Sequence, residues 1–323
     1  MVITMRANNV LGIIYSNAYD SVLSELTNAR TMGSVPFGGR YRLIDFALSN
    51  LVNCGINKVG IITKSNYQSL MDHIGTGKPW DLSRKRGGMF LLPPFNNSHT
   101  GMYRDRIQAL RGIMRFLEQS KEEYIVLMDT NVVCNFDLND MCRAHTESGA
   151  DITIAYHHGR APRLDDLMTF TFEENQKVAK IALDPKTSNP VDYAMNIILI
   201  SKALLTRLIN NAVSLNQDSF VRDVIQHNLK RLNIYGYEVS GFTSVFDSLQ
   251  SYYDISMSLL DPANCQELFT RERPVYTKVR DDMPAIYGLG STVKNSLVAD
   301  GCSIDGEVEN CILFRGVQIG KGA

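Results

Sequence analysis

Short runs of apolar residues, separated by stretches with helical spacing, dominate the first two thirds of the chain. The runs at residues 10–15, 58–63, 124–128 and 151–157 are apolar at most positions, which is typical of strands buried on both faces of a sheet. Between and after them, helical spacing predicts helices at 42–54, 67–73, 106–118, 138–148 and 201–211. This alternation predicts an α/β fold with a doubly wound, mostly parallel sheet. Residues 75–99 are expected to form a loop.

In such a fold, ligands bind at the carboxyl ends of the strands. We therefore expect a site near the segments that follow Tyr15, Thr63 and Met128.

The pattern changes after Val275, where apolar residues recur every few positions and Gly or Asn stands at the corners. This spacing resembles hexapeptide repeats, which form the coils of a left-handed parallel β-helix; an irregular β-hairpin region is the alternative. We expect an α/β domain over 1–262, a linker over 263–284 and the start of a β-helix over 285–323. The pattern reaches Ala323 in mid-repeat without a cap, so we expect a longer native chain or a partner that covers the last coil.

Composition narrows the functional classes. The chain has 323 residues, a formal net charge of −1 and a pI of about 6.6, which argues against nucleic-acid and membrane surfaces. Its six cysteines stand singly, without metal-ligand spacing, as in a reduced cytoplasmic protein. No signal-peptide pattern and no apolar run of membrane length is present.

A glycine turn at Gly38-Gly39 precedes a predicted helix and is followed by Arg40 and Arg42. A tight turn of this kind can present backbone N–H groups and guanidinium groups to a phosphate. The alternative is structural, with the arginines paired to Asp45 and other carboxylates.

The segment that contains this turn, PFGGRYRLIDFALSN, resembles a segment of the ADP-glucose pyrophosphorylases (glucose-1-phosphate adenylyltransferases), and the resemblance extends along essentially the whole chain. These enzymes make ADP-glucose for glycogen or starch. The resemblance implies a nucleotidyltransferase-like α/β domain followed by a left-handed β-helix. In the family, arginines near the turn lie where anionic effectors bind between the domains. The resemblance therefore implies that Arg30, Arg40, Arg42 and Lys64 bind a phosphate or sugar-phosphate effector.

The catalytic signature of that family is missing at several positions. Its glycine-rich loop brings backbone N–H groups to nucleotide phosphates, which side chains would obstruct. Side chains stand at three glycine positions of the loop, as Asn17, Ala18 and Asp20, and two cations of the phosphate site are replaced by Val22 and Met32. The acidic Asp105 enters the adenine segment. The two metal aspartates are replaced by Thr130 and Val245, and the glucose-phosphate lysine is replaced by Asp184.

These departures resemble the GlgD-type subunit of the family. We therefore predict a chain with no catalytic residue, metal or cofactor, which pairs with a catalytic subunit in a heterotetramer and modulates it. One alternative is an active adenylyltransferase with a rearranged loop, in which Asp129 and Asp247, the remaining metal-ligand candidates, bind Mg²⁺. Another is a sensor of phosphate or sugar phosphate that has no catalytic partner.

Overall fold

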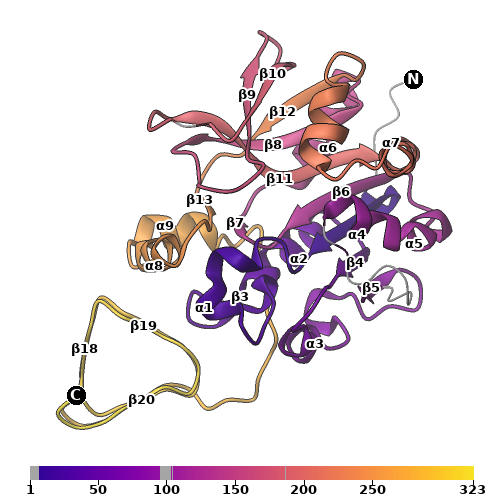
Figure 1. Cartoon of the computed structure of the whole chain (residues 1–323). Helices are drawn as coiled ribbons and strands as arrows, with labels where there is room; N and C mark the ends of the chain where they lie inside the picture. The colour runs from indigo at the N-terminus through magenta and orange to yellow at the C-terminus, as the bar shows by residue number, and fades with distance from the viewer. Residues whose placement is uncertain (1–6, 95–102, 104, 186) are drawn as a thin grey trace.

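The computed structural model describes residues 7–94, 103, 105–185 and 187–323 (Figure 1). A large sheet with helices on both faces forms its centre, which confirms the α/β class. One half of the sheet is parallel, in the order β6-β1-β4-β5. Its strands are β1 (Val10–Tyr15), β4 (Lys58–Ile62), β5 (Gly88–Leu92) and β6 (Tyr124–Asp129). The predicted strands at 10–15, 58–63 and 124–128 agree with this half to within a residue.

The other half of the sheet is mixed. The long strand β11 (Val191–Ser201) runs antiparallel to β6, to β8 (Ile152–Gly159) and to β9 (Met168–Phe172). A hairpin joins β9 to β10 (Val178–Leu183), and β12 (Ile234–Glu238) lies parallel to β8 at the edge. The chain reaches β11 from this hairpin and not through a crossover helix, so it enters the sheet in the reverse direction.

Helices cover both faces of the sheet. One face carries α2, α3 and α6, and the other carries α4, α5 and α7. The predicted helix 106–118 is in fact two helices, because regular structure breaks at Ile113, directly after the weak helix former Gly112. The helices are α1 (Ser24–Thr27), α2 (Leu43–Asn53), α3 (Gln68–Ile74), α4 (Arg106–Gly112), α5 (Met114–Gln119), α6 (Leu138–Ser148), α7 (Lys202–Ser214), α8 (Leu249–Ser258) and α9 (Pro262–Leu268).

The segment predicted as a loop at 75–99 contains regular structure in its described part. A 3₁₀ turn at Lys78–Trp80 buries the Trp80 side chain in the core, and β5 extends the parallel sheet. The loop prediction was therefore wrong for this part. Glycine and charged residues dominate the sequence before β5 and hide a strand of only five residues.

Besides the two hydrophobic cores between the sheet and its covering helices, a third core joins the glycine-turn region to the last helices. It is built around Phe37, Phe46 and Phe246, whose rings meet edge to face, and it includes the fully buried Leu268 of α9. The predicted linker 263–284 therefore starts with a helix that packs on the α/β core; the domain boundaries stay a prediction. Short strand pairs flank this core: β2 (Pro36–Phe37) with β3 (Tyr41–Arg42), and β7 (Val132–Cys134) with β13 (Thr243–Val245).

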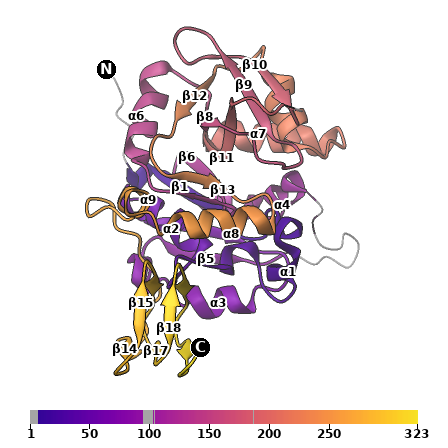
Figure 2. The same ribbon diagram turned by 90° about the vertical axis from the view of Figure 1, so that its left-hand side faces the viewer.

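The last forty residues form short strands that pair in parallel in three ladders. The ladders are β14-β17-β20, β15-β18 and β16-β19, and Figure 2 shows β15 and β18 side by side in the yellow C-terminal segment. The strands are β14 (Ile286–Tyr287), β15 (Thr292–Lys294), β16 (Leu297–Val298), β17 (Ser303–Ile304), β18 (Glu307–Glu309), β19 (Ile312–Leu313) and β20 (Gln318–Ile319). No helix in the described ranges has the length and apolar character needed to cross a membrane.

Candidate functional site

The carboxyl ends of β1 and β6 lie side by side, as the sequence predicts. Tyr15 ends β1 and is in register with Asp129, which ends β6. The first residue of α4, Arg106, reaches the same place from a helix whose N-cap is Asp105. Three side chains from separate elements therefore meet where an open α/β sheet binds its ligand.

Arg106 and Asp129 form a buried ion pair at this place. The Nη2 atom of Arg106 lies 2.5 Å from Oδ2 of Asp129, and the two side chains are 15% and 0% exposed. The guanidinium carbon lies 4.6 Å from the centre of the Tyr15 ring and 5.7 Å from that of Phe220, so aromatic rings hold the cation as well. Burial raises the pKa of Asp129, and the Arg106 charge opposes that rise.

The ion pair engages the carboxylate that a Mg²⁺ ion at the end of β6 would need. Mg²⁺ needs oxygen ligands in a near-octahedral arrangement, whereas the Asp129 carboxylate is held by a guanidinium group. Within the described ranges, no group of three or more His, Cys, Asp or Glu side chains could hold a metal ion. The cation at this carboxylate is part of the chain itself.

The other positions compared with metal aspartates have structural partners. The Thr130 hydroxyl donates to the backbone oxygen of Tyr15 at 3.2 Å, and Val245 pairs with Val132 in the small β13-β7 sheet. Asp247, the second metal candidate, accepts hydrogen bonds from the Arg163 backbone N–H at 2.7 Å and from the Ser248 hydroxyl at 3.0 Å. Ser248, and not Asp247, is the N-cap of α8.

The loop after β1 is closed by its own hydrogen bonds. The two oxygens of Asp20 accept from the Met32 backbone N–H at 2.7 Å and from the Asn17 amide at 2.6 Å. The Asn17 oxygen accepts in turn from the backbone N–H of Lys64 at 2.7 Å. Two backbone N–H groups in this region thus bind side chains of the chain and are not offered to a phosphate.

Apolar packing completes the closure of this loop. Met32 is fully buried in the third core, and Val22 packs against the same core. Ala18 contacts the core beneath α4 and α7. These apolar side chains pack the loop against the hydrophobic cores. They carry no positive charge, which a phosphate site requires.

Asp184, which replaces the glucose-phosphate lysine, and Asn196 both have left-handed backbone. Asn196 and Asp184 have φ angles of +54° and +49°, in the left-handed region. The Asn196 amide donates to the Tyr19 hydroxyl at 3.0 Å, and burial raises the pKa of Tyr19 to about 12. Asp184 accepts from the Leu167 backbone N–H at 3.0 Å, so its carboxylate has a local structural partner.

Asp20 gives this closed loop a pH dependence. Burial raises the pKa of its carboxyl to about 6, against the opposing hydrogen bonds from Asn17 and Met32. Because the folded pKa exceeds that of the unfolded chain, the carboxyl disfavours folding at neutral pH and this cost diminishes as the pH falls from 7 towards 4. We expect a carboxyl ¹³C NMR signal with a midpoint near pH 6 that Asp20→Asn removes; a midpoint near 4 would contradict the buried placement.

The glycine turn contacts the C-terminal ladders. Gly38 and Gly39 have φ angles of +58° and +81°, and a Cβ atom on Gly39 would lie 3.5 Å from the backbone oxygen of Leu313. Arg40 follows the turn and lies 3.9 Å from Asp300, which is also 3.7 Å from Arg315. The turn thus places its first arginine against the last segment of the chain.

Arg42 lies near other positively charged side chains. Its Nη1 donates to the backbone oxygen and the hydroxyl of Ser69 at 2.6 and 2.9 Å. Its pKa is lowered by burial and then by the charges of Arg30 and, more weakly, Arg280. Arg280 and Arg315 belong to this cluster, and sequence reasoning missed both because they lie far along the chain.

Asp45 and Lys64 contact other groups than the arginines of the cluster. Asp45 is bound by the Arg42 backbone N–H at 3.0 Å and by His73 Nε2 at 2.6 Å, not by an arginine side chain. The Lys64 ammonium lies over the Tyr103 ring, 5.7 Å from its centre, and acts on the pKa of Asp20. Lys64 therefore faces the closed loop, whereas Arg30, Arg40 and Arg42 gather near the C-terminal segment.

Comparisons with known proteins agree with this fold. The nucleotidyl transferase family model matches residues 12–247. The glycogen biosynthesis protein GlgD of Bacillus subtilis (strain 168) is 37% identical over 98% of this chain and 83% of its own length, and that of Geobacillus stearothermophilus is 38% identical over 98% and 82%. A glucose-1-phosphate adenylyltransferase of Clostridium acetobutylicum is 31% identical over 98% and 84%. The chain therefore belongs to the nucleotidyl transferase family and, within it, to the group of GlgD proteins and glucose-1-phosphate adenylyltransferases.

Proposed function

We propose that this chain is a GlgD-like, non-catalytic subunit that acts in glycogen synthesis by modulating a catalytic glucose-1-phosphate adenylyltransferase. The observation that carries the proposal is the buried Arg106–Asp129 ion pair at the end of β6. An internal cation occupies the carboxylate that a catalytic metal would need. The proposed subunit therefore binds no Mg²⁺ and needs no cofactor.

The closed loop supports the same proposal. Nucleotidyl transfer needs backbone N–H groups and cations at the phosphates, since charge develops there in the transition state. In this chain Asp20 and Asn17 accept hydrogen bonds from the backbone N–H groups of Met32 and Lys64 beside the loop, and Asp20 adds a negative charge where a triphosphate would lie. The loss of one such group typically costs about 10²–10³ in rate, so their combined loss is expected to abolish measurable turnover.

The arginine cluster supports a regulatory role. Arg30 and Arg280 both act electrostatically on Arg42, and Arg40 and Arg315 share the Asp300 carboxylate. Crowded guanidinium groups lower their mutual repulsion by binding an anion. We propose that the ligand is phosphate or a sugar phosphate, bound between the α/β region and the C-terminal ladders.

We infer that the C-terminal ladders are the first coils of a left-handed β-helix built from hexapeptide repeats. Their three parallel ladders support this inference. The first coil exposes Met283, Ile286, Tyr287 and Leu289, which suits a contact with another subunit in the proposed heterotetramer. All six cysteines are free, in keeping with the proposed cytoplasmic location.

The test is pyrophosphate release from ATP and glucose 1-phosphate. We expect no release above background with this chain alone, at less than about one thousandth of the partner's rate. Addition of the chain to a catalytic subunit from the same organism is expected to raise its rate or to shift its response to phosphate. Turnover by the isolated chain that Asp129→Asn abolishes would establish the alternative, an active enzyme.

The arginine cluster also favours a second candidate, an anion sensor without a catalytic partner. Both candidates predict phosphate binding, so binding alone does not separate them. Size-exclusion chromatography with the catalytic subunit does. A stable mixed complex supports the regulatory subunit, and a homo-oligomer that ignores the added subunit supports the sensor.

A further inference from the structure

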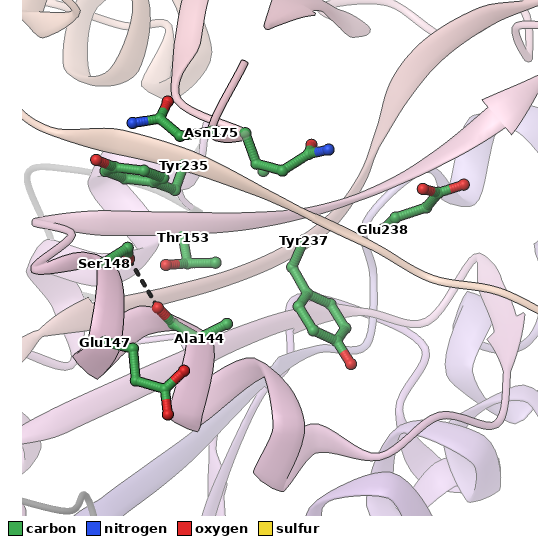
Figure 3. Close-up of a pocket in the computed structure, with 10 residues that line it drawn as sticks. Ala144, Glu147, Ser148, Thr153, Asn175, Tyr235, Tyr237 and Glu238 are labelled. Atoms are coloured by element: carbon green, nitrogen blue, oxygen red, sulfur yellow. Dashed lines mark hydrogen bonds between the residues drawn. The ribbon is translucent and has the colours of Figure 1, made fainter. Parts of the chain in front are cut away.

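A surface groove lies apart from the nucleotide-like site, at the edge strand of the sheet. It has a volume of about 580 Å³, within the usual range for small-ligand sites. Its walls are the last turn of α6, the start of β8, the edge strand β12 and the turn between β9 and β10 (Figure 3). None of its lining residues belongs to the closed loop, the ion pair or the arginine cluster.

Two tyrosines line the groove from one face of β12. Tyr235 and Tyr237 are alternate residues of the strand, so their side chains leave it on the same face. Gly236 between them belongs to the opposite face, where an added Cβ would lie 2.4 Å from the Phe172 ring. That face is filled by Phe172 and Tyr156, which fixes the strand and leaves the two half-buried tyrosines on the groove side.

Two amides lie on the β9–β10 turn beside the tyrosines. The Asn175 oxygen accepts from the Lys177 backbone N–H at 3.2 Å, and the Gln176 oxygen accepts from the Tyr156 hydroxyl at 2.9 Å. The Asn175 amide keeps its NH₂ group to donate on the groove side, whereas the Gln176 side chain reaches the Tyr156 hydroxyl on the opposite face of β12. The groove thus combines aromatic rings with hydrogen-bond donors from an exposed turn.

The charges at the groove exclude an anionic ligand. No Lys, Arg or His is among the residues that line it, and Glu147 and Glu238 are. Figure 3 shows these carboxylates at different ends of the group of side chains, and no group of three or more His, Cys, Asp or Glu among the described residues could hold a metal ion. The Glu238 carboxylate lies 3.5 Å from the oxygen of the Tyr156 hydroxyl, which donates its proton to Gln176 at the shorter distance of 2.9 Å. The remaining chemistry is that of a neutral ligand with apolar faces and many hydroxyl groups.

We propose that this groove binds a neutral oligosaccharide. Sugar rings present C–H faces that pack on tyrosine rings, and their hydroxyls accept from amide N–H groups and donate to carboxylates. Tyr235 and Tyr237, two residues apart on a strand and hence roughly 7 Å apart along it, offer contacts for successive sugar units. This binding activity is additional to the proposed regulatory function and does not require the catalytic subunit.

The test is calorimetric titration of the full chain with maltoheptaose. We expect saturable binding that Tyr235→Ala weakens at least about tenfold, because ring stacking is lost, and that Tyr235→Phe changes by less than about threefold. Asn175→Ala, on the exposed turn, is expected to weaken binding several-fold. Tyr253→Ala, an exposed tyrosine on α8, is the matched control and should bind as the parent does.

Three results would overturn the proposal. The first is the absence of saturable heat at about 10 mM maltoheptaose, and the second is equal weakening of binding in the Tyr253→Ala control. The third is sugar binding that both Asn175→Ala and Tyr235→Phe retain and that spermidine displaces. The last outcome would assign the groove to a cation. Because the titration contains no nucleotide and no partner, its result is independent of the turnover assay.

Discussion

Arg106→Met is expected to lower the free energy of unfolding by about 3–5 kcal/mol. The substitution keeps the apolar stem that packs beside Tyr15 and Phe220, and it removes the charge that faces Asp129. A carboxylate with no exposed surface is then left without its cation, which is the costly way to break a buried ion pair. Urea unfolding followed by circular dichroism measures the change.

The double variant Arg106→Met/Asp129→Leu distinguishes the cost of an unpaired buried carboxylate from the cost of losing the ion pair itself. Replacing both charges by apolar groups of similar size is often neutral or stabilising, so we expect stability to return to within about 1 kcal/mol of the parent. Arg111→Met, on the exposed side of the same helix, is the matched control and should change stability by less than about 0.5 kcal/mol. A single variant as stable as the control would contradict the buried pair.

The loss of unfolding free energy in Arg106→Met, relative to the parent, should also depend on pH. Burial already raises the pKa of Asp129, and the variant lacks the Arg106 charge that opposes the rise. The folded variant therefore binds the Asp129 proton more tightly than the unfolded chain does, so its stability increases as the pH falls from 7 towards 4. We expect the deficit relative to the parent to shrink over that range; a deficit that grows on acidification would contradict this assignment.

Arg42→Met is expected to weaken phosphate binding by at least about tenfold. Hydrogen bonds to charged groups contribute about 1.5–3 kcal/mol, and 1.4 kcal/mol corresponds to a factor of ten in affinity. Arg42 is the half-buried member of the cluster, and its pKa is lowered by burial and by Arg30. Phosphate should raise the melting temperature of the parent, at constant ionic strength, and should do so much less for the variant.

The control for this prediction is Arg84→Met, which removes an arginine from an exposed pair with Asp81 outside the cluster. Its phosphate response should equal that of the parent. Equal stabilisation of all three proteins by phosphate would mean that binding does not involve Arg42. A loss in the control as large as in Arg42→Met would mean that phosphate acts through net charge alone.

Three strands of the parallel half, β1, β4 and β6, were predictable because they are apolar at most positions, whereas β5 was not. The run 10–15 is β1 without a change of boundary, and the buried face of α2 follows from its helical spacing. The direction of β11 was not predictable from such runs, because an apolar run has the same composition in either direction. Its reversal depends on the β9–β10 hairpin, whose strands alternate exposed and buried residues only in part.

The sequence points to the residues that line this site, but not to the contacts that they make. The sequence indicates that Asn17 and Asp20 replace glycines, and the structure adds that they bind the loop to itself. The partner of Asp129 lies 23 residues earlier, on another element, and local spacing gives no sign of it. One signal was available: a carboxylate at the end of a mostly apolar strand needs a buried partner, and Arg106 begins α4, which comes before α5 and that strand in the sequence.

The Arg106–Asp129 pair makes the closed site a case of competition within one molecule. A guanidinium group anchored on α4 stays within reach of the Asp129 carboxylate, so its effective concentration there is in the millimolar range or above, whatever the solution contains. An incoming Mg²⁺ ion must displace this tethered cation before it meets a free carboxylate. Restoration of a glycine-rich loop alone would therefore leave the Asp129 carboxylate paired with Arg106.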